Sequence, residues 1–146
     1  NIQGDEPLIN PDAIDTLVEQ FDKSIGIGNA YVYVNNNYKL HDSNVVKVVT
    51  DLSNNAVYYS RFGIPYHKKE EVPFKQQLGL YAFNRHMLKL FEELEVGELE
   101  KAESVEMLRY IENGFAVRMI EVEDHGLSVD TEDDLKRVEE FLNGLH

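Results

Sequence analysis

The sequence predicts an α/β fold. Apolar runs typical of strands alternate with amphipathic stretches typical of helices along the whole chain. The run at 45–49, Val-Val-Lys-Val-Val, is nearly continuous in apolar residues, as in a strand that is buried on both faces. Asn10 and Pro11 precede the first amphipathic stretch in the way that an N-cap and a first-turn proline do. The 146 residues are therefore expected to form one α/β domain or part of one.

The first half of the chain is expected to contain one helix and several strands. Asn1 and Ile2 fit the end of a strand. The helix after Asn10 is broken at 25–28, and its apolar residues recur at helical spacing: Ile14, Leu17, Val18 and Phe21. Strands are expected at 30–34, 45–49 and 56–59, the last two joined as a hairpin. Residues 35–37 predict a turn, and 60–71 a loop with a solvated second half.

The second half is expected to alternate regularly. A strand at 78–83 is followed by a helix at 85–94 and a second helix at 102–112. Asn113 and Gly114 end that second helix with residues that tolerate the left-handed conformation. A strand follows at 115–122. Thr131 then caps a last helix, whose core-facing residues are expected to be Leu135, Val138, Phe141 and Leu142.

Composition limits the possible partners. The chain has 14 basic and 27 acidic side chains and a net charge of −13. Such a field disfavours nucleic acid and anionic membranes as partners. No apolar run approaches the length of a membrane span. The absence of cysteine excludes disulfides and thiolate chemistry, which is consistent with a cytoplasmic location.

Two polar segments stand where strands give way to helices, the usual ligand-binding edge of an open α/β sheet. In residues 3–7, Gly4 allows close backbone approach to a ligand and Asp5 suits a hard cation. Asp130 has the same setting before the last helix. Two carboxylates from separate strand ends can share one Mg²⁺ with phosphate oxygens and water. The simpler readings are a polar turn at Asp5 and a helix-start acid at Asp130.

Other charged residues are candidates for ligand recognition. Arg61 follows a strand and can pair with a carboxylate or phosphate, or else form a surface salt bridge. Glu100, Glu103 and Glu106 recur at three-residue spacing, so they are expected along one side of a helix and its entry. They either face a hydroxyl-rich or cationic group or form a solvated acidic face. The five histidines show no zinc-binding spacing.

Seven short stretches spread over almost the whole chain carry a resemblance to a known family: 1–8 (NIQGDEPL), 44–49 (NVVKVV), 56–66 (AVYYSRFGIPY), 78–83 (LGLYAF), 99–109 (LEKAESVEMLR), 112–114 (ENG) and 129–135 (VDTEDDL). In this order they resemble the 3-deoxy-manno-octulosonate cytidylyltransferases, also called CMP-Kdo synthetases. The resemblance implies a Rossmann-like nucleotide-diphospho-sugar transferase fold. Residues 1–146 would be the C-terminal portion of its three-layer αβα domain, with a mixed sheet.

The resemblance also implies an activity. The family transfers CMP from CTP to the anomeric hydroxyl of a 3-deoxy-octulosonate-type sugar acid and releases pyrophosphate, as a cytoplasmic homodimer in lipopolysaccharide biosynthesis. Carried over residue by residue, Asp5 and Asp130 are the Mg²⁺ ligands, and Arg61 faces the sugar carboxylate. Gln3 lies beside the nucleotide. The residues near the sugar hydroxyls are Tyr81, Glu103 and Glu106. Such a reaction needs positioning and charge neutralisation more than covalent catalysis.

Three residues depart from the family pattern. Gln77 stands where His is usual, Met107 where Gln is common, and Ser128 where Gly is usual. Gln77 and Met107 fall where the sugar is expected, so both belong to the predicted sugar site. We expect retained nucleotidyl chemistry with an altered sugar specificity, for example toward an 8-amino-8-deoxy analogue.

The family's glycine-rich phosphate loop and most of its cytosine pocket are absent from residues 1–146. The expectation is a chain that binds the sugar, completes the metal site and contributes to the dimer, but does not catalyse alone. The start on Asn1, without methionine and inside a polar cluster, agrees with a fragment. Two alternatives remain open: CMP transfer to another keto-sugar or a phosphonate, and a non-catalytic α/β ligand-binding or dimerisation fragment.

Overall fold

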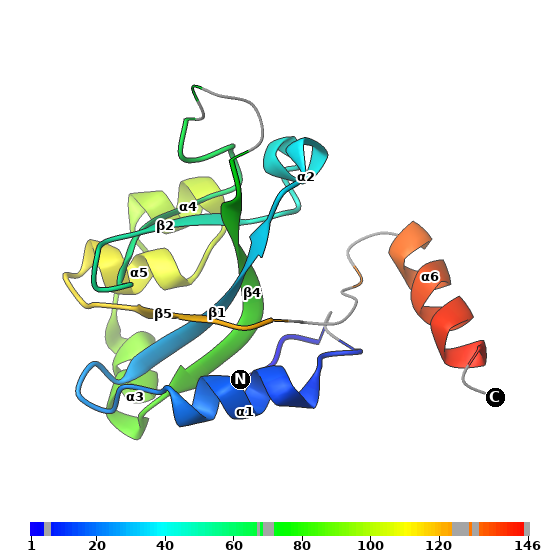
Figure 1. The fold of residues 1–146 in the computed structure, drawn as a ribbon. Coiled ribbons are helices and arrows are strands. Elements are labelled where there is room, and N and C mark those ends of the chain that lie inside the picture. The colour runs from blue at the N-terminus through cyan, green and yellow to red at the C-terminus, as the bar shows by residue number, and fades with distance from the viewer. Residues whose placement is uncertain (5–6, 67, 69–71, 124–128, 130–131, 145–146) are drawn as a thin grey trace.

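A mixed sheet forms the centre of the computed structural model (Figure 1), which describes all residues except 5–6, 67, 69–71, 124–128, 130–131 and 145–146. Its strands are β1 (Ile27–Val34), β2 (Lys47–Thr50), β3 (Ala56–Ser60), β4 (Phe74–Phe83) and β5 (Arg118–Glu121), in the spatial order β3-β2-β4-β1-β5. The β1–β5 pair is parallel and the other three pairs are antiparallel. The hairpin expected between β2 and β3 is confirmed.

The N-terminal residues extend this sheet beside the second half of β4. The Asn1 ammonium and carbonyl bond the backbone of Tyr81 at 2.8 and 2.9 Å, and the Gln3 N–H donates to the Gly79 carbonyl at 2.9 Å. Ile2 forms a bridge with Leu80. The expected strand end at Asn1 and Ile2 is therefore confirmed as a short extended segment paired with β4.

Helices cover both faces of the sheet. The helix α1 (Pro11–Glu19) packs on one face through Ala13 and Leu17, and that cluster contains Ala30 and Val32 of β1. On the other face lie α3 (Arg85–Glu93), α4 (Glu98–Glu103) and α5 (Met107–Glu112); the core there includes Tyr31, between those two β1 residues. Side chains alternate between the faces of a strand, so each face has its own core. The predicted three-layer α/β architecture is confirmed (Figure 1).

Asparagine side chains begin three of the helices. Asn10 accepts from the Asp12 N–H at 3.0 Å, and Asn84 accepts from the Met87 N–H at 2.8 Å, which confirms the helices expected after these residues. Asn36 caps a short helix, α2 (Asn37–His41), so the simple turn expected at 35–37 is wrong.

The single helix expected over 102–112 is also wrong. Ser104 adopts a left-handed conformation with φ +53° and ends α4, and α5 begins at Met107. The guanidinium of Arg61 bonds the Glu103 and Ser104 carbonyls at 2.8 and 3.4 Å, so a group from outside the helices supports the break. Consequently the glutamates at 100, 103 and 106 do not share one helix side.

The lengths of the central strand β4 and the edge strand β5 differ from expectation. β4 begins at Phe74, not at Leu78, because Gln76 and Gln77 lie between paired strands despite their polarity. β5 covers only Arg118–Glu121 of the expected 115–122. The run at 45–49 is expected to be buried on both faces of the sheet. Only Lys47 and Val48 are buried, and the other three residues of the run are half-buried.

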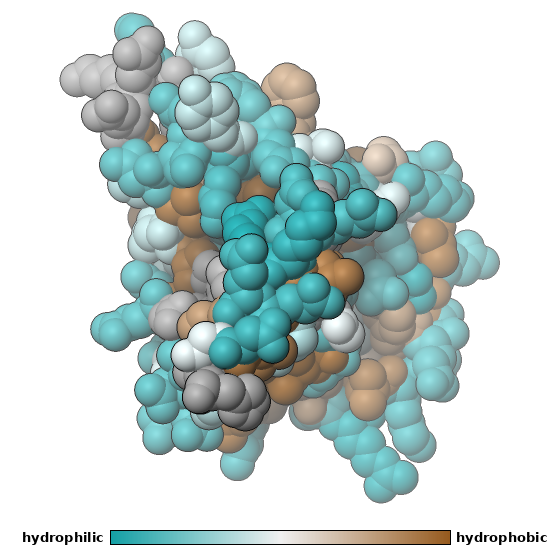
Figure 2. Space-filling model, turned by 90° about the vertical axis from the view of Figure 1, so that its right-hand side faces the viewer, coloured by the Kyte–Doolittle hydropathy of each residue, from teal (hydrophilic) through white to brown (hydrophobic). Residues whose placement is uncertain are grey.

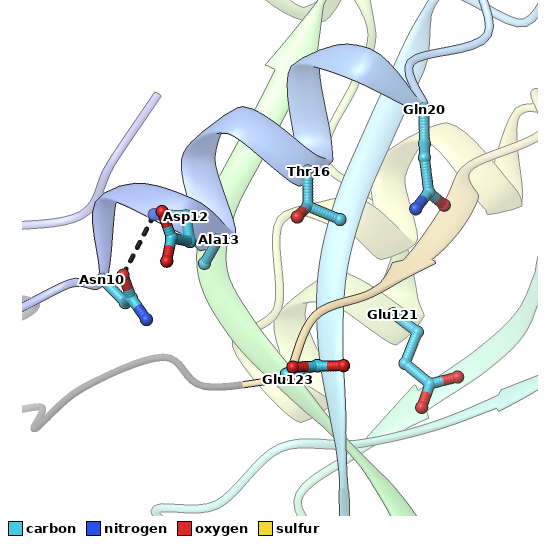
Figure 3. Close-up of a pocket in the computed structure, with 7 residues that line it drawn as sticks. All are labelled: Asn10, Asp12, Ala13, Thr16, Gln20, Glu121 and Glu123. Carbon is cyan, nitrogen blue, oxygen red and sulfur yellow. Dashed lines mark hydrogen bonds between the residues drawn. The ribbon is translucent and has the colours of Figure 1, made fainter.

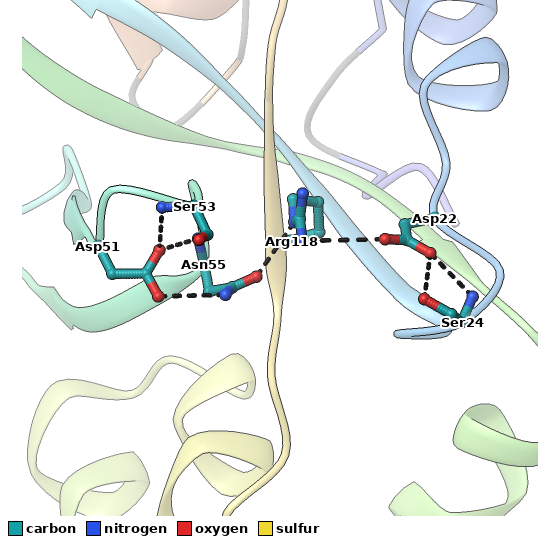
Figure 4. Close-up of polar contacts among 6 residues, drawn as sticks. All are labelled: Asp22, Ser24, Asp51, Ser53, Asn55 and Arg118. Carbon is teal, nitrogen blue, oxygen red and sulfur yellow. Dashed lines mark hydrogen bonds and ion pairs between the residues drawn. The ribbon is translucent and has the colours of Figure 1, made fainter.

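The sheet closes on itself at one end. Asn55, just before β3, forms an antiparallel bridge with Arg118 of β5, and Ala56 N donates to Val117 O at 2.8 Å. Figure 4 shows the side chains around this contact: Arg118 Nε donates to Asn55 Oδ1 at 3.0 Å, and its Nη2 lies 3.8 Å from Asp22 Oδ2. Hydrogen bonds from Asn55, chiefly from its backbone N–H, lower the pKa of the exposed Asp51. Arg118 therefore connects the β2–β3 turn, β5 and the segment between α1 and β1.

The last helix, α6 (Glu132–Asn143), stands apart from the sheet in Figure 1. Of its four residues expected to face the core, Val138 is 4 % exposed, but Leu135, Phe141 and Leu142 are 47, 51 and 45 % exposed. The expectation that all four face the core is therefore wrong. Viewed from that side, the surface is mainly hydrophilic with apolar side chains between (Figure 2). Among the described residues no helix has the length and apolarity that crossing a membrane requires.

Candidate functional site

Two of the predicted substrate residues are in contact on β4, and a third packs over the stretch of strand between them. Gln77 and Tyr81 lie on either side of an irregularity in the pairing of β4 with β1. The Gln77 Nε2 group donates to the Tyr81 hydroxyl at 2.7 Å and to the Leu78 carbonyl. Tyr81 of the 78–83 stretch and Gln77, which precedes that stretch and departs from the family pattern, are therefore in direct contact.

Gln3 joins this group from the N-terminal segment. Its side chain lies over Gly79, where a Cβ atom would stand 2.7 Å from Gln3 Oε1 and 3.0 Å from Gln3 Cβ. Glycine at this position lets the two segments approach. The N-terminal segment thus places the predicted nucleotide neighbour, Gln3, over Gly79, midway in the sequence between the predicted sugar contacts Gln77 and Tyr81.

Glu103 organises a second group at the end of β3. Its carboxylate accepts from the Tyr58 hydroxyl at 3.1 Å, the Ser60 hydroxyl at 2.7 Å and the Arg61 N–H at 2.8 Å. Burial raises the pKa of Glu103, but these hydrogen bonds and the Arg61 charge outweigh it, so that pKa is lowered. The carboxylate is therefore ionised and held against β3.

The Arg61 side chain is held by backbone oxygens. Its Nε, Nη1 and Nη2 donate to the carbonyls of Glu103, Ser43 and Ser104 at 2.8, 2.9 and 3.4 Å. A guanidinium has five N–H donors, so each terminal nitrogen retains one for a ligand. The structure fixes the group in place, and its contact with a sugar carboxylate stays a prediction.

Lys47 supports the backbone at Arg61 from inside the sheet. It is fully buried, and its ammonium donates to the carbonyls of Asp42, Val45 and Arg61 at 2.9, 2.6 and 2.5 Å. Burial lowers the pKa of Lys47, although the nearby acidic charges oppose this effect. Sequence analysis did not single it out. Its signal is a lone charge within the Val-Val-Lys-Val-Val run.

The remaining predicted residues are dispersed. Glu106 is exposed and precedes α5, whereas Met107 is 3 % exposed and packs in the core beneath that helix. Asp5 and Asp130, the predicted metal ligands, lie outside the described residues. Within the described residues, no three acidic or histidine side chains are grouped as a metal site would require.

A hollow of about 430 Å³ lies elsewhere, between α1 and the end of β5. Figure 3 shows Asp12, Thr16 and Gln20 from α1 and its end, and Glu121 and Glu123 on the opposite side. Three of its lining side chains are carboxylates, which disfavours anionic ligands. It contains none of the predicted site residues. The residues on and against β4, Gln3, Gln77 and Tyr81, are therefore the stronger candidate site.

Comparison with known proteins identifies the family of this chain. A family model described as cytidylyltransferase matches residues 1–124. The chain belongs to the cytidylyltransferase family. It is 42 % identical over 142 residues to the 3-deoxy-manno-octulosonate cytidylyltransferase of Solibacter usitatus and 39 % identical over 157 residues to that of Syntrophotalea carbinolica. The matches cover 94 and 99 % of this chain but 56 and 63 % of those relatives. The family resemblance found in the sequence is confirmed.

Solved structures agree. The fold of the cytidylyltransferase chain matches CMP:2-keto-3-deoxy-manno-octonic acid synthetase complexed with CTP at a TM-score of 0.90 and 31 % identity, covering 100 % of this chain and 61 % of that one. The inositol-1-phosphate CTP transferase of T. maritima matches at a TM-score of 0.58 and 15 % identity, which shows a shared fold. The predicted Rossmann-like nucleotidyltransferase fold is therefore confirmed.

Proposed function

We propose that residues 1–146 hold the sugar acid and complete the metal site of an enzyme that transfers CMP from CTP to a 3-deoxy-octulosonate-type sugar acid. The observation that carries the proposal is the hydrogen bond between Gln77 and Tyr81 on β4, with Gln3 packed over Gly79 between them in the sequence. The similarity to a synthetase complexed with CTP supports it. We further propose that the enzyme is a cytoplasmic homodimer, in the lipopolysaccharide pathway that the resemblance implies.

The reaction is an in-line displacement. The anomeric hydroxyl oxygen of the sugar attacks the α-phosphorus of CTP, and a new oxygen–phosphorus bond forms. The bond from that phosphorus to the bridging oxygen breaks, pyrophosphate leaves with the electron pair, and the hydroxyl proton passes to solvent. Arg61, held by three carbonyls, directs its remaining N–H donors at the sugar carboxylate. Gln77 and Tyr81 orient the sugar.

The donor chemistry of the proposed metal site fits Mg²⁺. Asp5 and Asp130 offer hard carboxylate oxygens, and Mg²⁺ uses one or two carboxylates together with phosphate oxygens and water. When bound there, the ion neutralises charge that develops on the phosphates. The two aspartates hold it, and Arg61 neutralises the sugar carboxylate.

The hydrogen bonds of Gln77 are compatible with an 8-amino sugar. Both of its amide hydrogens donate within the chain, to Leu78 O and the Tyr81 hydroxyl, which leaves the amide oxygen as an acceptor. An ammonium group has donors only, so an acceptor at this position suits it. We therefore propose the 8-amino-8-deoxy analogue as the preferred substrate.

A turnover assay tests the proposal. The full-length gene product that contains residues 1–146 is supplied with CTP, Mg²⁺ and either 3-deoxy-manno-octulosonate or its 8-amino analogue, and CMP-sugar and pyrophosphate are measured. We expect both products, with a higher kcat/KM for the 8-amino sugar. The variant Gln77→His is expected to shift the preference toward the plain sugar. Failure to form CMP-sugar from either acid would refute the cytidylyl transfer, and a clear wild-type preference for the plain acid would refute the specificity.

A further inference from the structure

The irregularity in β4 is a bulge of unusual size. Asn29 of β1 pairs with Tyr81, and Tyr31 pairs with Gln77. Between these pairs β1 has the single residue Ala30, whereas β4 has Leu78, Gly79 and Leu80. Three residues therefore occupy the length of one, and the backbone of β4 leaves the regular ladder between the two predicted sugar contacts.

The bulge determines the distance between Gln77 and Tyr81. Residues four apart on a regular strand are separated by about 13 Å, too far for their side chains to bond. In this sheet both residues stand opposite β1 residues that are only two apart, a separation of about 7 Å on the same face. The outcome is the 2.7 Å hydrogen bond between Gln77 Nε2 and the Tyr81 hydroxyl.

The side chain of Asn29 supports the bulge. Asn29 is fully buried, and its Nδ2 donates to the carbonyls of Leu78 and Leu80 at 2.9 and 3.0 Å. Its Oδ1 accepts from the Tyr59 hydroxyl at 3.1 Å. Both of its donors are therefore used on the backbone that has left the ladder. Buried carbonyls without such donors are costly, so the bulged conformation depends on this carboxamide.

We propose that Asn29 is a positioning residue of the sugar site. By donating hydrogen bonds to the bulged backbone, it holds Gln77 and Tyr81 close enough for both to bind the same sugar. This role rests on the proposed function, which makes Gln77 and Tyr81 the sugar contacts. Asn29 itself is buried below the site and acts through β4.

The test compares three variants in the full-length gene product that contains residues 1–146. Asn29→Ala removes both donors, and Asn29→Ser retains one. Val117→Ala is the matched control, because Val117 is as fully buried as Asn29, lies in the core cluster that contains Tyr59 and Tyr81, and is absent from every bond around the bulge given above. For each variant, KM for the sugar acid, KM for CTP and thermal stability are measured. The ¹³Cζ resonance of Tyr81, identified by its loss in Tyr81→Phe, reports the Gln77 hydrogen bond without turnover.

We expect Asn29→Ala to raise KM for the sugar acid about tenfold or more, with KM for CTP within about twofold of the wild type. Asn29→Ser is expected to be intermediate. Val117→Ala is expected to lower the melting temperature with both KM values and the Tyr81 resonance unchanged. The Tyr81 resonance is expected to shift in Asn29→Ala. An Asn29→Ala protein that loses stability as Val117→Ala does, but keeps the wild-type sugar KM and Tyr81 resonance, would overturn the inference.

The two proposals fail separately. If the wild type converts neither sugar acid, the proposed function fails, and the Tyr81 resonance in Asn29→Ala still decides whether Asn29 holds the bulge. If the wild type is active and the resonance and sugar KM do not respond to Asn29→Ala, only the positioning role is wrong.

Discussion

Truncation of Glu100 is expected to destabilise the fold by about 3–5 kcal/mol. Glu100 of α4 and Arg109 of α5 form a two-point ion pair at 2.7 and 2.6 Å, and the exposed fractions of their side chains are 9 and 14 %. The same guanidinium donates to the Phe91 carbonyl at 3.1 Å and lies 3.9 Å from the centre of that ring. Glu100→Ala therefore leaves a nearly buried charge with a carbonyl and a ring as its remaining partners.

Urea unfolding of the full-length gene product measures this cost. In thermal unfolding, where 1 kcal/mol corresponds to roughly 2–4 °C, the melting temperature is expected to fall by about 10 °C. The matched control is Glu98→Ala, because Glu98 pairs with Lys101 at 3.1 Å on the same helix but is 91 % exposed. It is expected to change stability by less than about 1 kcal/mol. The double variant Glu100→Leu/Arg109→Met is expected to recover most of the loss, since no charge is left unpaired. Equal effects of Glu100→Ala and Glu98→Ala would refute the reasoning.

Three further predictions concern a cap, a close contact and a titrating group. Asn84→Ala is expected to cost about 1 kcal/mol in urea unfolding, because it removes the bond to the Met87 N–H; an unchanged midpoint would contradict this. Gly79→Ala is expected to cost about 1–3 kcal/mol, because the new Cβ meets Gln3 Oε1 at 2.7 Å and Gln3 Cβ at 3.0 Å. A double-mutant cycle with Gln3→Ala checks it, and additive effects would exclude the contact. The pKa of Glu103 in the folded state lies below its ordinary value of 4.5, so its contribution is present above about pH 4.5 and lost as the pH falls through the lowered value. The stability difference between wild type and Glu103→Gln should therefore shrink from pH 7 to pH 3; a constant difference would count against this assignment.

Local signals predicted most of the fold. Asn10 marks the first helix because its side chain accepts a backbone N–H that the first helical turn leaves free. Asn84 does the same for α3, although the sequence analysis did not single it out. The hairpin of β2 and β3 follows from two strand-like runs joined by a short turn. These features depend on neighbours in the sequence, so the sequence alone reveals them.

The errors arise where distant residues decide the local structure. The chain leaves the helix at Ser104, where the Arg61 guanidinium, about forty positions earlier, bonds two nearby carbonyls. β4 continues back through Gln76 and Gln77 because strands pair on both sides of it. Polar residues of low strand preference give no local sign of such pairing.

The sequence could propose residues for the candidate site but not their geometry. Gln3, Gln77 and Tyr81 could be named from motif resemblance; in the structure Gln77 bonds Tyr81, and Gln3 packs over Gly79. The bulge that unites them has no motif. Its visible trace is Asn29, a polar residue inside an otherwise apolar strand, which only the register of β1 against β4 explains.

The closure of the sheet at Asn55 and Arg118 also imposes an order of assembly during synthesis. The two residues are 63 positions apart, and at about 5–20 residues per second a ribosome needs several seconds to produce the intervening chain. β3 can pair with β2 early, because their hairpin is local. Until β5 emerges, the start of β3 presents unpaired backbone groups to other nascent chains. Arrival of Arg118 removes that hazard, so β5 protects a strand made long before it.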